Sequence, residues 1–203
     1  MVRPRTISDQ QILEVASKCF LERGPSVSTD VIAHKLGVTP QALLKRFRNK
    51  KELLIAAMKP CRSAPWLDMV QEGPDDRPVN EQLTEILQEL ASFFSEVVRR
   101  MEILQWSGVS MKELMASFEE PPPVRDIRAI AGWLHRLHDK KMIRKIDFDA
   151  TAMFILTAMH GPAMLTQFLG KPPTGHTFNE YISQYVNILL HGLLDSSNSE
   201  IEQ

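Results

Sequence analysis

The residues whose types and spacing most clearly suggest a chemistry lie between Gln41 and Lys51. This stretch contains five basic residues and no acidic one. Ammonium and guanidinium groups on a short helix bind phosphates, so the pattern indicates a nucleic-acid partner. The competing interpretation is a solvated helix face that binds nothing. The five basic residues are Lys45, Arg46, Arg48, Lys50 and Lys51.

The charge of the whole chain favours the first interpretation. The net charge of the 203 residues is −1. Residues 1–55 carry 10 Lys and Arg against 5 Asp and Glu, a net of +5, whereas the remainder carries 14 basic and 20 acidic residues, a net of −6. A basic N-terminal part on an acidic remainder is expected when only the first part approaches a polyanion.

The elements that must position these side chains are indicated by capping signals. Ser28 begins a short helix and Gly37 ends it. Thr39 and Pro40 begin the next helix, because Thr is a favoured N-cap and Pro suits the first helical position. We expect Leu43 to face inward, which leaves the basic side chains on the opposite face. Helix, tight turn and helix is an arrangement that places the second helix in the major groove of DNA.

The next predicted helix carries an unusual charge at its beginning. Asn49 is its N-cap, and Lys50 and Lys51 occupy its first turn. The positive end of the helix dipole lies there and disfavours cations. A phosphate bound beside the two lysines would compensate this cost. The alternative is that both lysines are simply solvated.

The rest of the chain is also predicted to be helical. Pro and Gly cluster over residues 60–78, which predicts an irregular connection, and long segments with helical spacing of apolar residues follow it. Two strongly apolar helices are expected from Asp147 and from Thr177, and the polar tail from about residue 195 is expected to be disordered. No alternating strand pattern occurs, so we expect an all-α fold.

Several protein classes receive no support. No segment has the ~18 consecutive apolar residues of a membrane-spanning helix, so we expect no membrane partner. Cys19 and Cys61 lie far apart and suit a reducing cytoplasm. His135 and His138 share a helix face without a third ligand, so we expect neither a metal nor a cofactor. No nucleophile elbow, P-loop, zinc-protease or dinucleotide motif indicates an enzyme.

Residues 28–54, with the helix before them, resemble the DNA-binding domain of the tetracycline-repressor (TetR) family of bacterial regulators. Two positions differ from the family's usual pattern: Leu44 stands in place of a common tyrosine, and Arg46 in place of histidine or tyrosine. The matching residues are Ile32-Ala33, Leu36-Gly37-Val38-Thr39, Leu43, Phe47, Asn49-Lys50 and Leu53.

The resemblance implies a three-helix helix-turn-helix DNA-binding domain over residues 1–55. A larger helical domain for effector binding and dimerisation would follow over residues 56–203. It also implies a homodimer that reads a palindromic operator, with half-sites about 34–36 Å apart or a little more.

We assign roles at the DNA surface as hypotheses. Gln41 is expected to bond an adenine edge and Lys45 to reach a guanine, whereas Ala42 and Leu44 are expected to contact thymine methyl groups. Four further side chains are expected to hold phosphates, namely Thr39, Arg46, Arg48 and Lys50. The predicted DNA-binding set is Ser28, Thr39, Pro40, Gln41, Ala42, Leu44, Lys45, Arg46, Arg48 and Lys50.

The larger domain gives weaker signals. Nine of the ten methionines and all three tryptophans follow residue 55. Methionine lines permissive apolar pockets but also fills irregular cores, so both interpretations stay open. His160 is either a satisfied core histidine or a polar contact to a ligand. The predicted ligand-binding residues are Phe94, Met101, Trp106, Trp133, Met159 and His160.

A dimer seam is expected on the last two apolar helices. Small residues there permit close helix approach, although they would equally suit packing within one subunit. The predicted interface residues are Ala152, Ala158, Tyr181, Tyr185 and Leu189.

The expected function is that of a cytoplasmic transcriptional repressor released from operator DNA by a small hydrophobic effector. Two alternatives remain. One is a helix-turn-helix DNA-binding protein without an effector, and the other is an enzyme with an incidental basic region.

Overall fold

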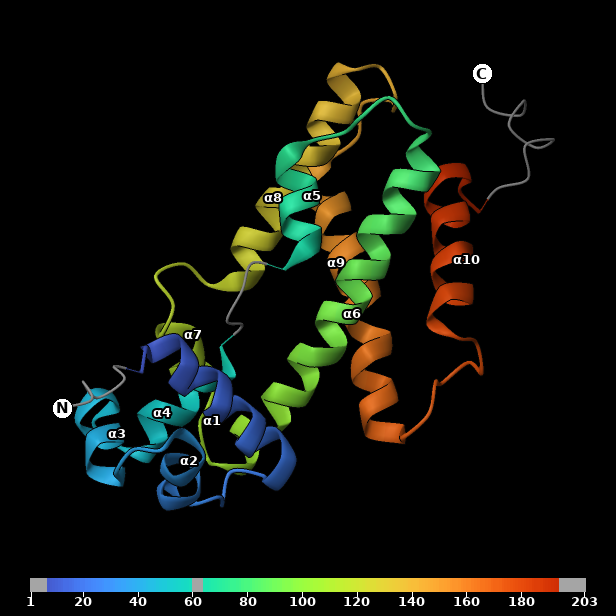
Figure 1. The fold of residues 1–203 in the computed structure, drawn as a ribbon. Coiled ribbons are helices and arrows are strands. Elements are labelled where there is room, and N and C mark those ends of the chain that lie inside the picture. The colour runs from blue at the N-terminus through green and yellow to red at the C-terminus, as the bar shows by residue number, and fades with distance from the viewer. Residues whose placement is uncertain (1–6, 60–63, 194–203) are drawn as a thin grey trace, which may run out of the picture. The chain divides into compact units, whose positions relative to one another are not determined.

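The computed structural model describes residues 7–59 and 64–193, and every regular element among them is an α-helix (Figure 1). The predicted all-α fold is therefore confirmed. The predicted tail from about residue 195 lies outside the described residues. The helices are α1 Asp9–Arg23, α2 Thr29–Leu36, α3 Pro40–Phe47, α4 Lys50–Met58, α5 Pro65–Glu72, α6 Val79–Trp106, α7 Met111–Ala116, α8 Pro122–Asp139, α9 Phe148–Leu169 and α10 Phe178–His191.

Contacts divide the chain into two compact units. The N-terminal unit comprises residues up to Ser63 together with Glu96–Arg125, and the C-terminal unit comprises Ala64–Ser95 and the residues from Asp126 onward. The long helix α6 thus contributes its second half to the N-terminal unit and its first half to the C-terminal unit. The predicted domain boundary after residue 55 does not anticipate that Glu96–Arg125 pack with the N-terminal helices. The boundary itself stays a prediction.

Capping interactions explain where several helices begin. The Ser8 hydroxyl accepts a hydrogen bond from the Gln11 amide at 3.2 Å, and the Gln11 side chain accepts one from the Ser8 amide at 2.9 Å. Thr177 and Glu180 form the same reciprocal pair at the start of α10. Both pairs satisfy amide groups that have no partner inside the helix. The spacing of polar residues in the sequence predicts both capping boxes.

The predicted irregular connection over residues 60–78 is wrong for its central part, where α5 lies. Pro65 is compatible with a helix there because it occupies the first turn, where its missing N–H group would have had no helical acceptor. Trp66 on the next position is fully buried, as is Val70 one turn later. Burial of these two side chains stabilises a helix that its proline content alone would not indicate.

The core of the N-terminal unit is formed where α1–α4 and α7 surround the second half of α6 (Figure 1). Apolar side chains from all six segments are buried together, which fixes the positions of the short helices α2 and α3. The central members are Ile12, Ala16, Phe20, Ile32, Leu43, Leu53, Ala57, Ile103, Leu104 and Leu114.

A buried cation also links three helices of this unit. The side chain of Arg100 on α6 is 10% exposed and donates to the Ser17 hydroxyl of α1 at 3.1 Å. It also donates to the Ala57 carbonyl of α4 at 3.0 Å and to Glu96 at 2.8 Å. The Ala57 carbonyl lies in the last turn of α4, where carbonyl groups lack helical donors. Arg100 therefore fixes α1 and the end of α4 to α6.

The C-terminal unit packs α5, the first half of α6, α8, α9 and α10 around a second core (Figure 1). A row of aromatic rings crosses this core. The distance between ring centres is 6.1 Å for Trp66 and Phe93, 5.5 Å for Phe93 and Phe94, and 5.1 Å for Phe94 and His160. Among the described helices, α9 alone is long and apolar enough to cross a membrane, a criterion that core helices of soluble proteins also meet.

Candidate nucleic-acid interface

The turn between α2 and α3 depends on Gly37. Its φ of 67° and ψ of 30° lie in the left-handed region, which a residue without a Cβ adopts at little cost. The Val38 amide bonds back to the Ala33 carbonyl at 3.0 Å, which satisfies the end of α2. The chain can therefore reverse direction and begin α3 two residues later.

Helix α3 is anchored by one side and exposed on the other. The Thr39 hydroxyl caps the helix by accepting from the Ala42 amide at 3.2 Å, and Leu43 is fully buried. Gln41, Ala42 and Lys45 are exposed, and Leu44 is half-buried. Within the described residues, the side chains of Gln41 and Lys45 have no hydrogen bond or ion pair, so both are available to a partner molecule.

Arg46 differs from its basic neighbours because it contacts α1. Its guanidinium donates to the Ile7 carbonyl and to the Asp9 carboxylate, the latter at 3.0 Å. Both side chains of the ion pair are exposed, so solvent screens the pair and its contribution is small. The sequence suggests a phosphate contact for Arg46 and gives no local signal for its partner, because Asp9 lies 37 positions away.

Arg48 occupies a strained turn between α3 and α4. Its φ is 58° and its ψ is −52°, and the Asn49 amide bonds to the Phe47 carbonyl at 2.6 Å. This is the positive-φ form of the γ-turn, which is rare for residues with a side chain. The turn leaves the Arg48 side chain exposed and places Asn49 as the N-cap of α4, where its side chain accepts from the Glu52 amide at 2.9 Å.

The two lysines in the first turn of α4 have different partners. Lys51 forms an ion pair with Glu113 of α7 at 2.6 Å, and this hydrogen bond, followed by one from the Ser110 amide, lowers the pKa of Glu113. Lys50 has no such partner among the described residues. The two lysines that were predicted to hold one phosphate together therefore differ. Lys50 can bind a phosphate directly, whereas Lys51 would first have to give up its ion pair with Glu113. Glu113 was not identified from the sequence because it lies 62 positions from Lys51.

A second contact between α4 and the residues after α7 reinforces this arrangement. The Lys59 ammonium donates to the Ser117 carbonyl and lies 4.5 Å from the centre of the Phe118 ring. Cations are attracted to the faces of aromatic rings. Helix α4 is thus held at both ends by the segment that contains α7.

The six predicted ligand-binding residues do not lie in one unit. Met101 and Trp106 belong to the N-terminal unit, and Trp106 is 66% exposed. Phe94 and His160 are brought together in the C-terminal unit, where burial lowers the pKa of His160 and favours its neutral form. Trp133 and Met159 are buried members of the core of that unit.

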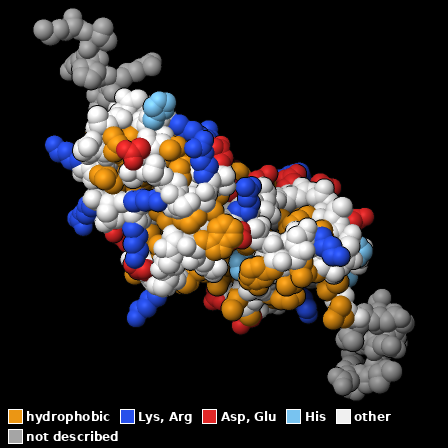
Figure 2. Space-filling view, turned by 90° about the horizontal axis from the view of Figure 1, so that it is seen from below, with side chains coloured by type: hydrophobic (Ala, Val, Ile, Leu, Met, Phe, Trp, Pro, Cys, Tyr) orange, Lys and Arg blue, Asp and Glu red, His pale blue; other side chains and the backbone are white. Residues whose placement is uncertain are grey.

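The predicted dimer residues lie on or beside an apolar surface. Ala152 and Tyr185 are buried, whereas Ala158, Tyr181 and Leu189 are half-buried. Exposed apolar side chains lie on the same two helices, and Figure 2 shows hydrophobic side chains gathered over this part of the molecule. We call these exposed residues the apolar face of α9 and α10: Met153, Phe154, Leu165, Phe168, Leu169, Ile188 and Leu190.

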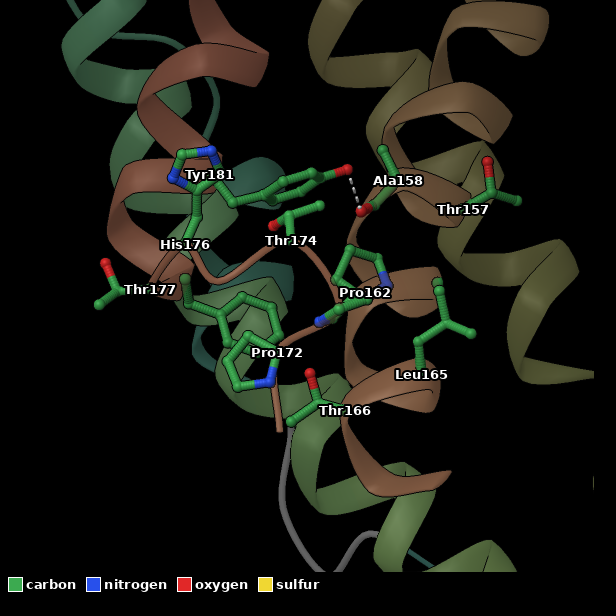
Figure 3. Close-up of a pocket in the computed structure, with 13 residues that line it drawn as sticks. Thr157, Ala158, Pro162, Leu165, Thr166, Pro172, Thr174, His176, Thr177 and Tyr181 are labelled. Carbon is green, nitrogen blue, oxygen red and sulfur yellow. Dashed lines mark hydrogen bonds between the residues drawn. The ribbon is translucent and has the colours of Figure 1, made fainter. Parts of the chain in front are cut away.

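A cavity of about 310 Å³ lies between the second half of α9, the start of α10 and the connection between these helices (Figure 3). None of the six predicted ligand-binding residues lines it. Two predicted dimer residues do: the Tyr181 hydroxyl donates to the Ala158 carbonyl at 3.0 Å across this site. Sequence reasoning missed the cavity because its walls come from ordinary apolar and threonine residues.

Comparisons with known proteins agree with this arrangement. Residues 12–57 match the family model described as bacterial regulatory proteins, tetR family. The chain is 25% identical over 166 residues to the HTH-type transcriptional repressor BdcR of Escherichia coli (strain K12), covering 77% of this chain and 80% of BdcR.

Solved structures share the fold at lower identity. A TetR-family transcriptional regulator from Pectobacterium atrosepticum has a TM-score of 0.63 at 20% identity and covers 90% of this chain and 92% of its own. FadR from Bacillus subtilis, in complex with stearoyl-CoA, has a TM-score of 0.61 at 14% identity. The match covers 92% of this chain and 100% of the FadR chain. The TetR-family regulator PfmR from Thermus thermophilus has a TM-score of 0.56 at 20% identity. The match covers 91% of this chain and 100% of the PfmR chain.

The family match covers nearly all of α1–α4, the four helices that present the exposed face of α3. The helices beyond them have the architecture of TetR-family regulators along most of the chain. Residues 12–57 therefore match the tetR family of bacterial regulatory proteins, and the chain as a whole is similar in fold to TetR-family regulators.

Proposed function

We propose that this protein is a cytoplasmic repressor that binds a palindromic operator as a homodimer and releases it when a small molecule binds. The observation that carries the DNA-binding part is the exposed face of α3, where Gln41 and Lys45 have no partner among the described residues. The similarity to BdcR, which is named a transcriptional repressor, supports the direction of the regulation.

The roles at the DNA surface follow from the chemistry of each side chain. Gln41 bonds an adenine edge, Lys45 bonds guanine, and Ala42 and Leu44 contact thymine methyl groups. Thr39, Arg48 and Lys50 bind phosphates and set the register, as do the exposed Ser28 and the N-terminal turn at Pro40. Arg46 joins them by exchanging its exposed contact with Asp9, which contributes little stability, for a phosphate.

Dimerisation supplies the second copy of α3 that a palindrome requires. The apolar face of α9 and α10 supports this part of the proposal, because large exposed apolar surfaces on soluble proteins mark interaction sites. Ala152, Ala158, Tyr181, Tyr185 and Leu189 contribute beside it. The two recognition helices then read half-sites about one turn of DNA apart, or a little more.

The effector lowers operator affinity by binding better to a conformation in which the two copies of α3 are wrongly spaced. FadR of Bacillus subtilis, which shares the fold, is seen in complex with stearoyl-CoA. This similarity supports ligand binding by the helical region, with Phe94 and His160 as the members of the predicted set that lie in contact. The second candidate function is DNA binding without an effector.

Selection of bound fragments from random duplex DNA tests this function. The full-length protein should enrich a palindrome at physiological ionic strength. Gln41→Ala should lose discrimination at one base pair per half-site at a cost of about 1–3 kcal/mol, and Lys45→Ala should do so at another. Gln71→Ala changes an exposed glutamine on α5 and serves as the matched control.

Two results would contradict the proposal at different levels. Equal weakening of all duplexes by Gln41→Ala would show that this side chain does not read a base. No preference of the unaltered protein for any duplex would exclude the operator-binding function altogether.

A further inference from the structure

We propose that the cavity between α9 and α10 binds a compact, neutral, largely apolar molecule that carries a hydroxyl, ketone or lactone oxygen. The site is separate from the DNA-binding surface and from the predicted ligand-binding residues. Ligand binding to this cavity can be tested on the protein alone, without an operator.

The size and walls of the cavity suit a small ligand. Its volume of about 310 Å³ is at the lower end of the ~300–1,000 Å³ that ligand pockets occupy. The lining includes Leu165 and Pro162 from α9, Pro172 from the connection, and Phe178 and Tyr181 from α10 (Figure 3). Apolar walls of this kind favour the hydrocarbon part of a ligand.

A proline in α9 creates a polar group at the edge of this cavity. Pro162 has no backbone N–H, so the Ala158 carbonyl four residues earlier lacks its helical donor. The Tyr181 hydroxyl donates to this carbonyl instead, at 3.0 Å. The phenol oxygen can still accept a hydrogen bond, and a ligand hydroxyl can supply it.

Two further hydroxyls can serve a ligand carbonyl. Thr166 and Thr174 line the cavity from α9 and from the connection; Figure 3 shows Thr174 next to the Tyr181 ring and Thr166 farther away, beside Pro172. Within the described residues, neither hydroxyl has a hydrogen-bond partner. Their donors are therefore available to a ketone or lactone oxygen.

The lining favours neutral ligands. None of the cavity-lining residues is Lys, Arg, Asp or Glu, and His176 and Tyr181 are the titratable ones. Burial raises the pKa of Tyr181, so its hydroxyl stays protonated at neutral pH. His176 is the one lining residue that can carry a positive charge, and a carboxylate or phosphate would find no Lys or Arg in this lining. The ligand class is therefore neutral.

The alternative occupant is a side chain from a second copy of the chain. Leu165 of the apolar face of α9 and α10 lines the cavity, and so do Ala158 and Tyr181, which the dimer proposal places beside this face. The other exposed apolar side chains, which a second copy would cover, are not part of its lining. A separate small molecule is thus the occupant that the lining favours.

Fluorine NMR of protein that contains 3-fluorotyrosine tests the site directly. The chain has two tyrosines, Tyr181 and Tyr185, so Tyr181→Phe assigns both signals. Octan-1-ol is the neutral probe, and octanoate is an anion with the same number of carbon atoms. We expect octan-1-ol to shift the Tyr181 signal in a saturable way and octanoate to cause no saturable shift.

Gly161 provides a cavity-filling variant and a matched control. It lines the cavity, and a Cβ at this position would meet nothing within 4 Å. Gly161→Leu should raise the dissociation constant for octan-1-ol by about tenfold or more, whereas Gly161→Ala, which fills little of the space, should change it by less than about threefold. If Gly161→Leu does not fold, Thr166→Leu fills the same cavity from the next turn of α9.

Three results would overturn the proposal. The first is an equal response of the unaltered protein and the cavity-filling variant to octan-1-ol. The second is binding of octanoate as tight as that of octan-1-ol. The third is a Tyr181 signal that shifts with protein concentration and not with octan-1-ol, which would show that a second copy fills the cavity.

Discussion

The exposed face of α3 and the apolar face of α9 and α10 differ in chemistry and in how visible they are in the sequence. The α3 face is polar and cationic, and a single fully buried side chain, Leu43, anchors its helix. The face on α9 and α10 is hydrocarbon, with Phe168 as its most exposed member at 71%. A cationic cluster stands out along a chain, whereas apolar surface residues have the same composition as a core. Function is therefore easier to predict for the first face than for the second.

The largest effect is expected at the anchor of the polar face. Leu43→Ala removes a fully buried side chain and should lower the free energy of unfolding by about 2–5 kcal/mol. Urea unfolding followed by circular dichroism measures this change. Leu44→Ala on the next, half-buried position is the control and should cost less than about 1 kcal/mol. Equal costs for the two leucines would show that α3 is not held by one side.

A charge on the apolar face should change assembly more than folding. Phe154→Glu replaces a half-exposed ring on α9 and should raise the dissociation constant of the proposed dimer by more than about tenfold, because two like charges would meet in the proposed interface. Sedimentation equilibrium measures it. Val124→Glu alters an apolar residue of similar exposure outside this face. If both variants dissociate equally, the dimer does not use α9.

The strained turn at the end of α3 should give two effects of opposite sign. Arg48→Gly relieves the positive φ and should raise the free energy of unfolding by about 1 kcal/mol. The same change removes the proposed phosphate contact and should reduce the slope of log affinity against log salt by about 1. Arg48→Ala keeps the strain and loses only the contact. A salt slope unaffected by either variant would exclude Arg48 from the phosphate contacts.

The smallest effect concerns the ion pair between α4 and α7. Its hydrogen bonds lower the pKa of Glu113, so its contribution to stability is complete above the ordinary pKa of a glutamate and is lost as the pH falls through the lower folded-state value. Lys51→Met should therefore weaken the acid dependence of unfolding measured by urea titration at several pH values. Unchanged acid dependence in Lys51→Met would mean that the pair does not persist in solution.

The fold was predictable wherever a local signal sets a helix boundary. Ser8, Thr39, Asn49 and Thr177 all cap the helices that their sequence context indicates. The same reasoning missed α5 because a proline in the first turn resembles a helix breaker until the burial of Trp66 is known.

The site was predictable only in part, for a related reason. Gln41 and Lys45 were assigned to the exposed side of α3 from helical spacing alone, and the structure places them there. The partners of Arg46 and Lys51 lie 37 and 62 residues away, so no local pattern indicates them. The cavity beside Pro162 also depends on tertiary contacts between α9 and α10.

The division of α6 has a consequence for hydrogen exchange. Residues 79–95 of this continuous helix pack in the C-terminal unit, whereas residues 96–106 pack in the N-terminal unit, where Arg100 bonds to α1 and α4. Amide protection follows cooperative opening of packed units, not the length of a helix. The amides of the second half of α6 should thus exchange together with those of α1 and α4, at a rate distinct from that of the first half.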